Sequence, residues 1–250
     1  MISHDPARFV FLGASNLARG HRALAQCLES VLQPQSSEFF FALGPGRAYR
    51  ANGGILFHRY DSIETCGVLE RAGRDIDRTS SLTVLLTDIG NDIMYGVPVE
   101  ELIECLEGIL QKLGDLEADI HVSPISSWLE RQLDPVRFNI LKALFYPKSG
   151  MTYPSTIDAL IRINRYIRTE IRATIIEGLD AFVGLDKIHY SFFRSGSAWT
   201  RVAKSLAGKV SETKLHPICF SKMMESYGKH YRQLIFNDMM GLELCSTSYF

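Results

Sequence analysis

"SLTVLLTDIGND", residues 81–92, contains the pattern that decides the fold, because apolar and β-branched residues run directly into a polar turn with a glycine. A strand that is apolar on both faces is typical of a parallel sheet covered by helices. Gly90 and Asn91 tolerate turn conformations and Asp92 can cap a following helix, so ordinary turn chemistry is one explanation of the polar residues. The other is chemical, since open α/β sheets hold their active sites at the carboxyl ends of their strands.

Short strand patterns alternate with longer helical patterns along the rest of the chain. We expect strands at 8–13, 38–43, 81–87, 119–124 and 180–185, and helices at 16–33, 98–114, 155–176 and 195–210. This alternation predicts one domain, a three-layer α/β/α sandwich around a central, mostly parallel sheet with flavodoxin-like winding.

Two stretches depart from this alternation. Residues 126–154 are rich in aromatic residues and leucine, which predicts a lid or pocket wall, with additional core as the alternative. Residues 214–250 follow the predicted domain of residues 1–213, and we expect them to pack on it, with a homodimer contact as the alternative. The candidates for substrate contact in the first stretch are Trp128, Phe138, Phe145, Tyr146 and Tyr153.

Composition excludes several classes of protein. Apolar residues make up 46% and charged residues 22% of the 250, as in ordinary globular proteins, and the net charge of −1 leaves no overall attraction to nucleic acid or anionic membrane. No apolar run reaches the ~20 residues of a membrane span, and the amino terminus lacks the pattern of a signal peptide. The five scattered cysteines form no CxxC pair, which argues against disulfides and zinc and indicates a reducing, cytoplasmic location.

Reactive residue types follow several of the predicted strands. Ser15 follows the first, the glycine-rich stretch "GPGRAYRANGG" (44–54) the second, Asn91 the third, and Asp186 with His189 the fifth. A serine hydroxyl is a weak nucleophile unless an imidazole takes its proton, and a carboxylate can fix the tautomer of that imidazole. The Asp-x-x-His spacing lets both side chains face the same side of a tight turn. These residues therefore indicate acyl-transfer chemistry.

Simpler explanations exist for each of these residues alone. Ser15 could cap the helix that follows it, and His189 could be a buried structural histidine. The glycine-rich loop matches neither a P-loop nor a dinucleotide fingerprint, and the other six histidines show no spacing typical of metal ligands. We therefore expect neither a metal nor a cofactor.

Four blocks in order, "GASN" (13–16), "GPGR" (44–47), "GND" (90–92) and "DKIH" (186–189), resemble the SGNH hydrolases, also called the GDSL-type esterase and lipase superfamily. The resemblance covers roughly residues 8–210. Two departures are Ala14, where the family usually has aspartate before the serine, and Tyr190, where proline often follows the histidine.

The resemblance implies a serine nucleophile and an oxyanion hole. Ser15 would be the nucleophile, with Asp186 and His189 completing the triad. The Ser15 and Gly46 amides and the Asn91 side chain would hold the oxyanion, with Gly44 and Gly53 as alternatives to Gly46.

The implied activity is a metal-independent serine ester hydrolase that acts on a small-molecule ester through an acyl-enzyme. A non-catalytic domain with the same fold and a flavodoxin-like cofactor binder are the alternatives. Arg47 is either a solvated loop residue or a clamp for a substrate carboxylate or phosphate. The expected substrate-binding residues are Asn16, Arg47, Trp128 and Tyr190.

Overall fold

A five-stranded parallel sheet forms the centre of the computed structural model, which describes residues 6–55, 58–74, 81–208 and 215–235. The strand order β2-β1-β5-β6-β7 is that of a flavodoxin-like sheet, with the direction of winding reversing between β1 and β5. A separate two-stranded hairpin of β3 and β4 follows β2. The strand bounds are β1 Ala7–Leu12, β2 Ser37–Ala42, β3 Gly54–Ile55, β4 His58–Arg59, β5 Leu82–Leu86, β6 Asp119–Val122 and β7 Thr174–Ile175.

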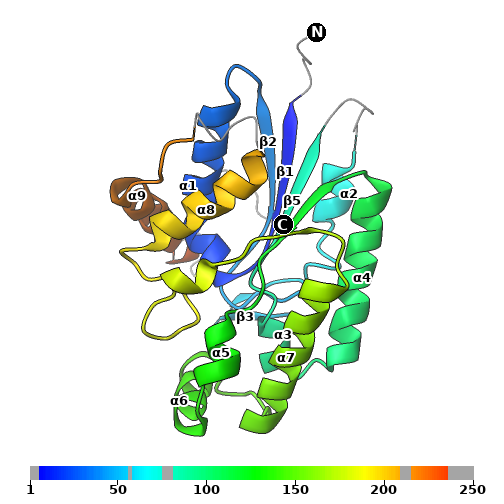
Figure 1. Cartoon of the computed structure of the whole chain (residues 1–250), viewed down its shortest axis with the longest axis vertical. Helices are drawn as coiled ribbons and strands as arrows, with labels where there is room; N and C mark the ends of the chain where they lie inside the picture. Colours follow the sequence, from blue (N-terminus) through cyan, green and yellow to red (C-terminus); the bar gives the residue numbers. More distant parts are fainter. Residues whose placement is uncertain (1–5, 56–57, 75–80, 209–214, 236–250) are drawn as a thin grey trace.

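Helices cover both faces of the sheet, which confirms the predicted three-layer sandwich (Figure 1). On one side lie α1 (Ser15–Leu32) and α8 (Ser195–Ala207), and on the other α2 (Val68–Ala72), α4 (Val99–Asp115) and α7 (Tyr153–Thr169). The two faces of β1 are both buried, because Val10 and Leu12 join one apolar cluster while Phe9 and Phe11 join the other. None of the helices in the described ranges is long and apolar enough to cross a membrane.

The carboxyl end of the sheet is covered by shorter helices, which gather at the lower end of Figure 1. These are α3 (Asn91–Met94), α5 (Ser127–Gln132), α6 (Pro135–Phe145) and, beside them, the 3₁₀ helix η1 (Leu179–Phe182). The aromatic stretch 126–154 therefore contains two helices. Asp134 caps α6 by accepting hydrogen bonds from the amides of residues 136 and 137.

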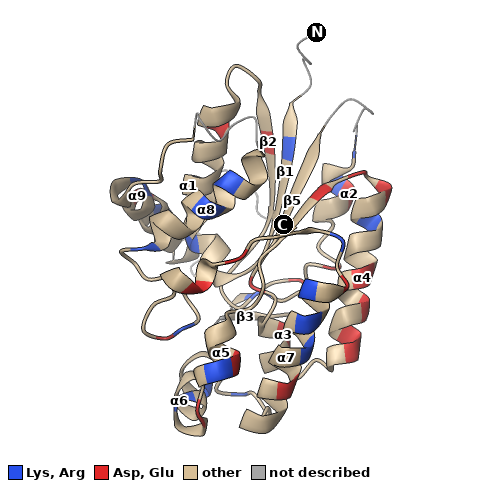
Figure 2. Ribbon diagram, in the orientation of Figure 1, with Lys and Arg blue, Asp and Glu red and all other residues tan. Residues whose placement is uncertain are grey.

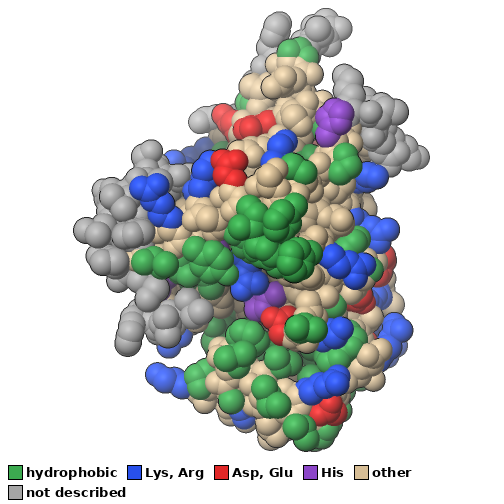
Figure 3. All heavy atoms as spheres, turned by 90° about the vertical axis from the view of Figure 1, so that its left-hand side faces the viewer, with side chains coloured by type: hydrophobic (Ala, Val, Ile, Leu, Met, Phe, Trp, Pro, Cys, Tyr) green, Lys and Arg blue, Asp and Glu red, His purple; other side chains and the backbone are tan. Residues whose placement is uncertain are grey.

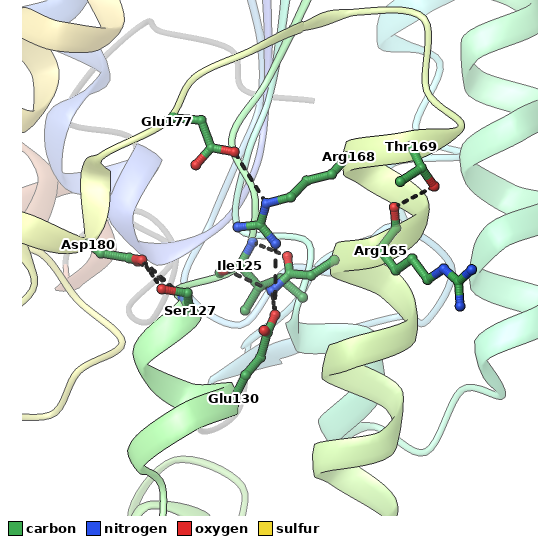
Figure 4. A network of polar contacts seen from close by, with 9 residues as sticks. Ile125, Ser127, Glu130, Arg165, Arg168, Thr169, Glu177 and Asp180 are labelled. Carbon is green, nitrogen blue, oxygen red and sulfur yellow. Dashed lines mark hydrogen bonds and ion pairs between the residues drawn. The ribbon is translucent and has the colours of Figure 1, made fainter.

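Polar contacts hold the start of α5 against α7 and η1 (Figure 4). The Ser127 amide and hydroxyl both donate to Asp180 in η1. On the α7 side, Asn164 Oδ1 accepts a hydrogen bond of 2.8 Å from the Ile125 amide, and its Nδ2 donates to the Ile125 carbonyl (3.0 Å) and to Glu130. The first part of the aromatic stretch is thereby attached to the main domain.

The predicted fifth strand at 180–185 is wrong. The fifth strand is β7, Thr174–Ile175, and α7 ends at Thr169 instead of residue 176. Residues 179–182 form η1, and Val183 makes an isolated bridge with Tyr190. A two-residue strand is too short to show a period, and isoleucines at helical spacing continue past α7, which explains the error.

The described part of the carboxyl-terminal extension packs on the domain. Its helix α9 (Phe220–Gln233) buries Met223 and Tyr227 in the cluster that contains α1 and α8. The Ser226 hydroxyl also donates to the Arg19 carbonyl of α1 (2.7 Å). The rest of the predicted extension, 214 and 236–250, lies outside the described residues. The homodimer contact stays a prediction.

Candidate active site

Ser15, His189 and Asp186 form a continuous line of hydrogen bonds. Ser15 Oγ, at the start of α1, lies 2.9 Å from His189 Nε2, and His189 Nδ1 lies 2.7 Å from Asp186 Oδ2. The other carboxylate oxygen of Asp186 accepts from the amides of His189 (2.9 Å) and Ile188 (3.1 Å). The turn therefore places the aspartate and histidine on the same side, as the three-residue spacing requires.

The protonation state of Asp186 determines how the imidazole is oriented. Burial acts to raise the pKa of Asp186, but the hydrogen bonds from His189 and Ile188 outweigh it and lower the pKa to about 2. The carboxylate is therefore ionised at neutral pH and accepts the proton of Nδ1. In the neutral imidazole this arrangement leaves Nε2 as an acceptor facing the Ser15 hydroxyl.

Asp88, which was not among the predicted site residues, holds the start of α1. Its backbone has φ 58°, in the left-handed region. Oδ2 accepts hydrogen bonds from the amides of Ala14 (2.9 Å), Asn16 (3.1 Å) and Leu17 (3.2 Å), and Oδ1 accepts from Asn16 Nδ2 (2.9 Å). The Ser15 amide is not among these donors, so it stays available for a ligand. In the sequence, the signal for this role is the position of Asp88, an acidic residue between the predicted strand and the turn that contains Gly90.

Asn16 connects the serine segment to the histidine loop. Its Oδ1 accepts from the Tyr190 amide (2.9 Å), while Nδ2 donates to the Ile188 carbonyl (3.2 Å) as well as to Asp88. The amide group is thus used within the protein, so Asn16 positions the site instead of binding through its polar atoms. Tyr190 lies beside it, with its ring packed against Trp199 at 5.6 Å. Both residues line the cavity described below.

Tyr146 and the Arg47 backbone orient the side chain of Asn91. The Tyr146 hydroxyl donates to Asn91 Oδ1, and Asn91 Nδ2 donates to the Arg47 carbonyl (2.7 Å). Burial raises the pKa of Tyr146, so its hydroxyl keeps the donated proton. Because a primary amide carries two N–H groups, one remains for a ligand. Tyr146 was predicted only as a substrate contact, and this positioning role depends on tertiary structure.

The residues after Asn91 hold the glycine-rich loop. Asp92 accepts hydrogen bonds of 2.7–2.9 Å from the amides of residues 49–51. The Tyr95 hydroxyl donates to the Gly46 carbonyl (2.7 Å). Gly46 has φ 76°, and a Cβ there would lie 2.5 Å from the Gly54 carbonyl oxygen, so both conformation and space require glycine. The polar turn after β5 therefore organises a second loop.

An apolar cavity of about 130 Å³ extends from Ser15 and Asn91 beneath α5 and α6. Phe145, at the end of α6, packs edge-on against the His189 ring with centroids 5.4 Å apart. Together with the two polar residues at its mouth, the cavity can hold an apolar group next to the serine. Its apolar lining includes Ile89, Ile93, Leu129, Leu133, Phe138 and Leu141.

Two predicted substrate-binding residues and one oxyanion candidate lie apart from this cavity. Arg47 is buried at 2% exposure, and its Nε donates to the Asp61 carbonyl (3.1 Å), so the predicted clamp is replaced by a structural contact. The Trp128 ring centroid lies 5.6 Å from Arg137 Cζ and 5.3 Å from Lys187 Nζ, and Trp128 does not line the cavity. Gly46 also does not line it.

Comparisons with known proteins give structural similarity only. No protein-family model and no curated protein sequence matches the chain. Similar solved structures include TesA (TM-score 0.45, 17% identity, 78% of this chain and 95% of that one). A gut microbial diltiazem-metabolizing enzyme gives a TM-score of 0.47 at 14% identity, and the match covers 82% of this chain and 46% of that one. The psychrotrophic esterase EstA from Pseudoalteromonas sp. gives a TM-score of 0.42 at 12% identity, and the match covers 83% of this chain and 97% of that one. We infer function from the residues of this chain.

Proposed function

We propose that this chain is a serine ester hydrolase of the SGNH type. The observation that supports the proposal is the line of hydrogen bonds from Ser15 through His189 to Asp186, next to an apolar cavity. Ser15 Oγ attacks the acyl carbon while its proton passes to His189 Nε2. The ester C–O bond then breaks, and the leaving alkoxide takes that proton. Water, deprotonated by the same nitrogen, then attacks the acyl carbon. The bond between that carbon and Ser15 Oγ breaks, the acid is released, and the proton on Nε2 returns to Oγ.

Three N–H donors are proposed to stabilise the oxyanion. They are the Ser15 amide and the second N–H of Asn91, from residues that line the cavity, and the Gly46 amide, which does not line it and would approach from the loop held against Asn91. Preorganised donors are effective because they do not need to reorient as charge develops. Asp88, Tyr146 and the loop contacts described above supply that preorganisation. In the described part of the chain, neither of the two backbone amides donates a hydrogen bond elsewhere.

The cavity is proposed to bind the acyl group. An apolar cavity of about 150 Å³ is known to stay dry and bind benzene, so 130 Å³ corresponds to a chain of roughly six carbon atoms. The polar groups at the entrance face the ester, and the leaving group would point toward solvent. We therefore expect esters of medium-length acids to be hydrolysed fastest.

Hydrolysis of p-nitrophenyl esters from acetate to octanoate tests the activity, with wild type compared with Ser15→Ala. We expect serine-dependent turnover and labelling of Ser15 by a fluorophosphonate. Turnover that persists in Ser15→Ala would contradict the mechanism. A folded wild type that neither turns over esters nor reacts with the fluorophosphonate would instead indicate the non-catalytic domain considered above.

Leu141→Trp tests the assignment of the cavity, because an indole at position 141 would fill part of it. We expect this variant to lose hexanoate and octanoate hydrolysis while keeping acetate hydrolysis. Ile140→Trp is the matched control, since Ile140 lies on the same helix but is 61% exposed. If both variants keep the wild-type chain-length profile, the cavity does not bind the acyl group.

A further inference from the structure

Several large apolar side chains are exposed at the end of α6, at the start of α9 and on the loop around His189. We call these residues the apolar rim: Leu144, Phe145, Leu185, Phe192, Phe193 and Phe220. Leu185 is fully exposed, and Phe193 is 80% exposed. Figure 3, which views the molecule from the side of α8 and α9, shows hydrophobic side chains gathered into patches with basic side chains beside them. Exposed apolar patches of this kind mark interaction surfaces.

Ring contacts connect the members of the rim to one another and to the site. Phe145 packs against His189, and Phe192 follows that histidine by three residues. Phe220, at the start of α9, lies 5.3 Å from Phe192 and 5.8 Å from Phe193 between ring centroids. Phe192, Phe193 and Phe220 therefore form one aromatic cluster shared by the histidine loop and α9, and Phe145 brings the end of α6 against His189 of the same loop.

The segments that carry the rim are strongly basic. Together they contain nine Lys and Arg but only three Asp and Glu, whereas the whole chain has 27 Lys and Arg and 28 Asp and Glu. The segments counted are 131–148, 185–194 and 219–232. Many of the acidic residues lie along α4, on the other side of the molecule (Figure 2). The net charge of −1 thus conceals a local excess of basic residues in the segments that carry the rim.

A lipid surface fits this combination better than a second copy of the chain. Two copies joined through the rim would bring two basic surfaces together and close both entrances. An anionic bilayer surface instead offers apolar chains to the aromatic residues and negative headgroups to the basic ones.

We propose that the apolar rim docks the protein on the surface of a bilayer that contains anionic phospholipid. The aromatic and leucine side chains enter the boundary between headgroups and acyl chains, and the surrounding basic residues contact the headgroups. In this orientation the entrance to the cavity faces the lipid. Docking does not depend on the proposed ester hydrolysis, and it is measured without turnover.

Sedimentation of the full chain with vesicles tests the proposal, using phosphatidylcholine alone and with phosphatidylglycerol. We expect binding to the anionic vesicles that weakens as salt is raised. Leu144→Ser with Phe193→Ser, and separately Lys148→Glu with Lys222→Glu, should each reduce binding by about tenfold or more. Ile161→Ser is the matched control, because Ile161 is 48% exposed on α7, outside the rim. Thermal unfolding of each variant checks that it is folded.

Two results would overturn the proposal. One is wild-type protein that fails to sediment with anionic vesicles, or folded rim variants that bind as well as wild type. The other is a dimer in light scattering that Leu144→Ser with Phe193→Ser dissociates, since the rim would then be covered by a second copy.

Discussion

Replacing Asp88 by asparagine should disrupt the start of α1 while nearly preserving the shape of the side chain. Asp88 accepts four hydrogen bonds, three on Oδ2 and one on Oδ1. If the new amide oxygen takes the Oδ2 position, the NH₂ group faces the NH₂ group of Asn16. The opposite orientation points NH₂ at three backbone amides. Neither orientation satisfies all four donors.

The loss of stability in Asp88→Asn can be estimated from the replacement of a charged acceptor by a neutral one. Hydrogen bonds to a charged group contribute ~1.5–3 kcal/mol each and neutral ones ~0.5–1.5 kcal/mol, so three weakened bonds cost about 3 kcal/mol. Asp88→Ala should cost more, because it leaves all four donors without their acceptor. Displacement of Ser15 by about 1 Å should also slow its labelling by a fluorophosphonate about a hundredfold.

Urea unfolding and labelling rates measure the two effects. Asp158→Asn is the matched control, since Asp158 is exposed on α7 and its ion pair with Arg162 is long, at 3.9 Å. We expect this control to change the free energy of unfolding by less than about 0.5 kcal/mol. If Asp88→Asn unfolds at the same urea concentration as the control, the four hydrogen bonds to Asp88 do not stabilise the fold as expected. Normal labelling of a destabilised Asp88→Asn would show that Asp88 stabilises the fold without positioning the serine.

Three further predictions concern single contacts. Tyr146→Phe removes one of two groups that orient Asn91, so kcat should fall about tenfold. This is less than the ~10²–10³-fold loss expected in Asn91→Ala, which removes the proposed oxyanion donor itself. An unchanged kcat in Tyr146→Phe would show that Tyr146 does not orient Asn91 for catalysis. Burial lowers the pKa of His21 to about 3 and of His230 to about 4, so the unfolded chain binds their protons first. The free energy of unfolding should therefore fall below pH ~6.5 by about 1.4 kcal/mol per pH unit for each histidine, and a flat urea profile from pH 7 to 5 would contradict this. The lowered pKa of Asp186 should contribute roughly 2 kcal/mol to the free energy of unfolding above pH ~4, and this contribution should disappear as pH falls through about 2. The free energies of unfolding of wild type and Asp186→Asn in urea should therefore converge on acidification. A difference between them that stays constant with pH would contradict this.

The first four strands and most helices were predictable because their patterns are local. Strands such as 81–87 show continuous apolar runs, and helices such as 16–33 show a regular apolar face. The fifth strand was not predictable, because Thr174–Ile175 is too short to have a period and gains its partner only from β6. The apolar residues that suggested a strand at 180–185 instead form part of η1 and the Val183 bridge to Tyr190.

The sequence by itself determined which reactive residues are present and that Ser15 and Asn91 follow the ends of strands. Ser15 and Asn91 follow β1 and β5, and parallel strands bring their carboxyl ends to one edge. Asp186 and His189 follow η1 instead of a strand, so for this pair the three-residue spacing was the informative signal. Their proposed roles await the experiments above. Only the tertiary structure decided the supporting contacts, such as Asp88 to Asn16 across 72 residues and Tyr146 to Asn91 across 55. A hydrogen bond between distant segments depends on where the chain returns in space, and no local pattern records that.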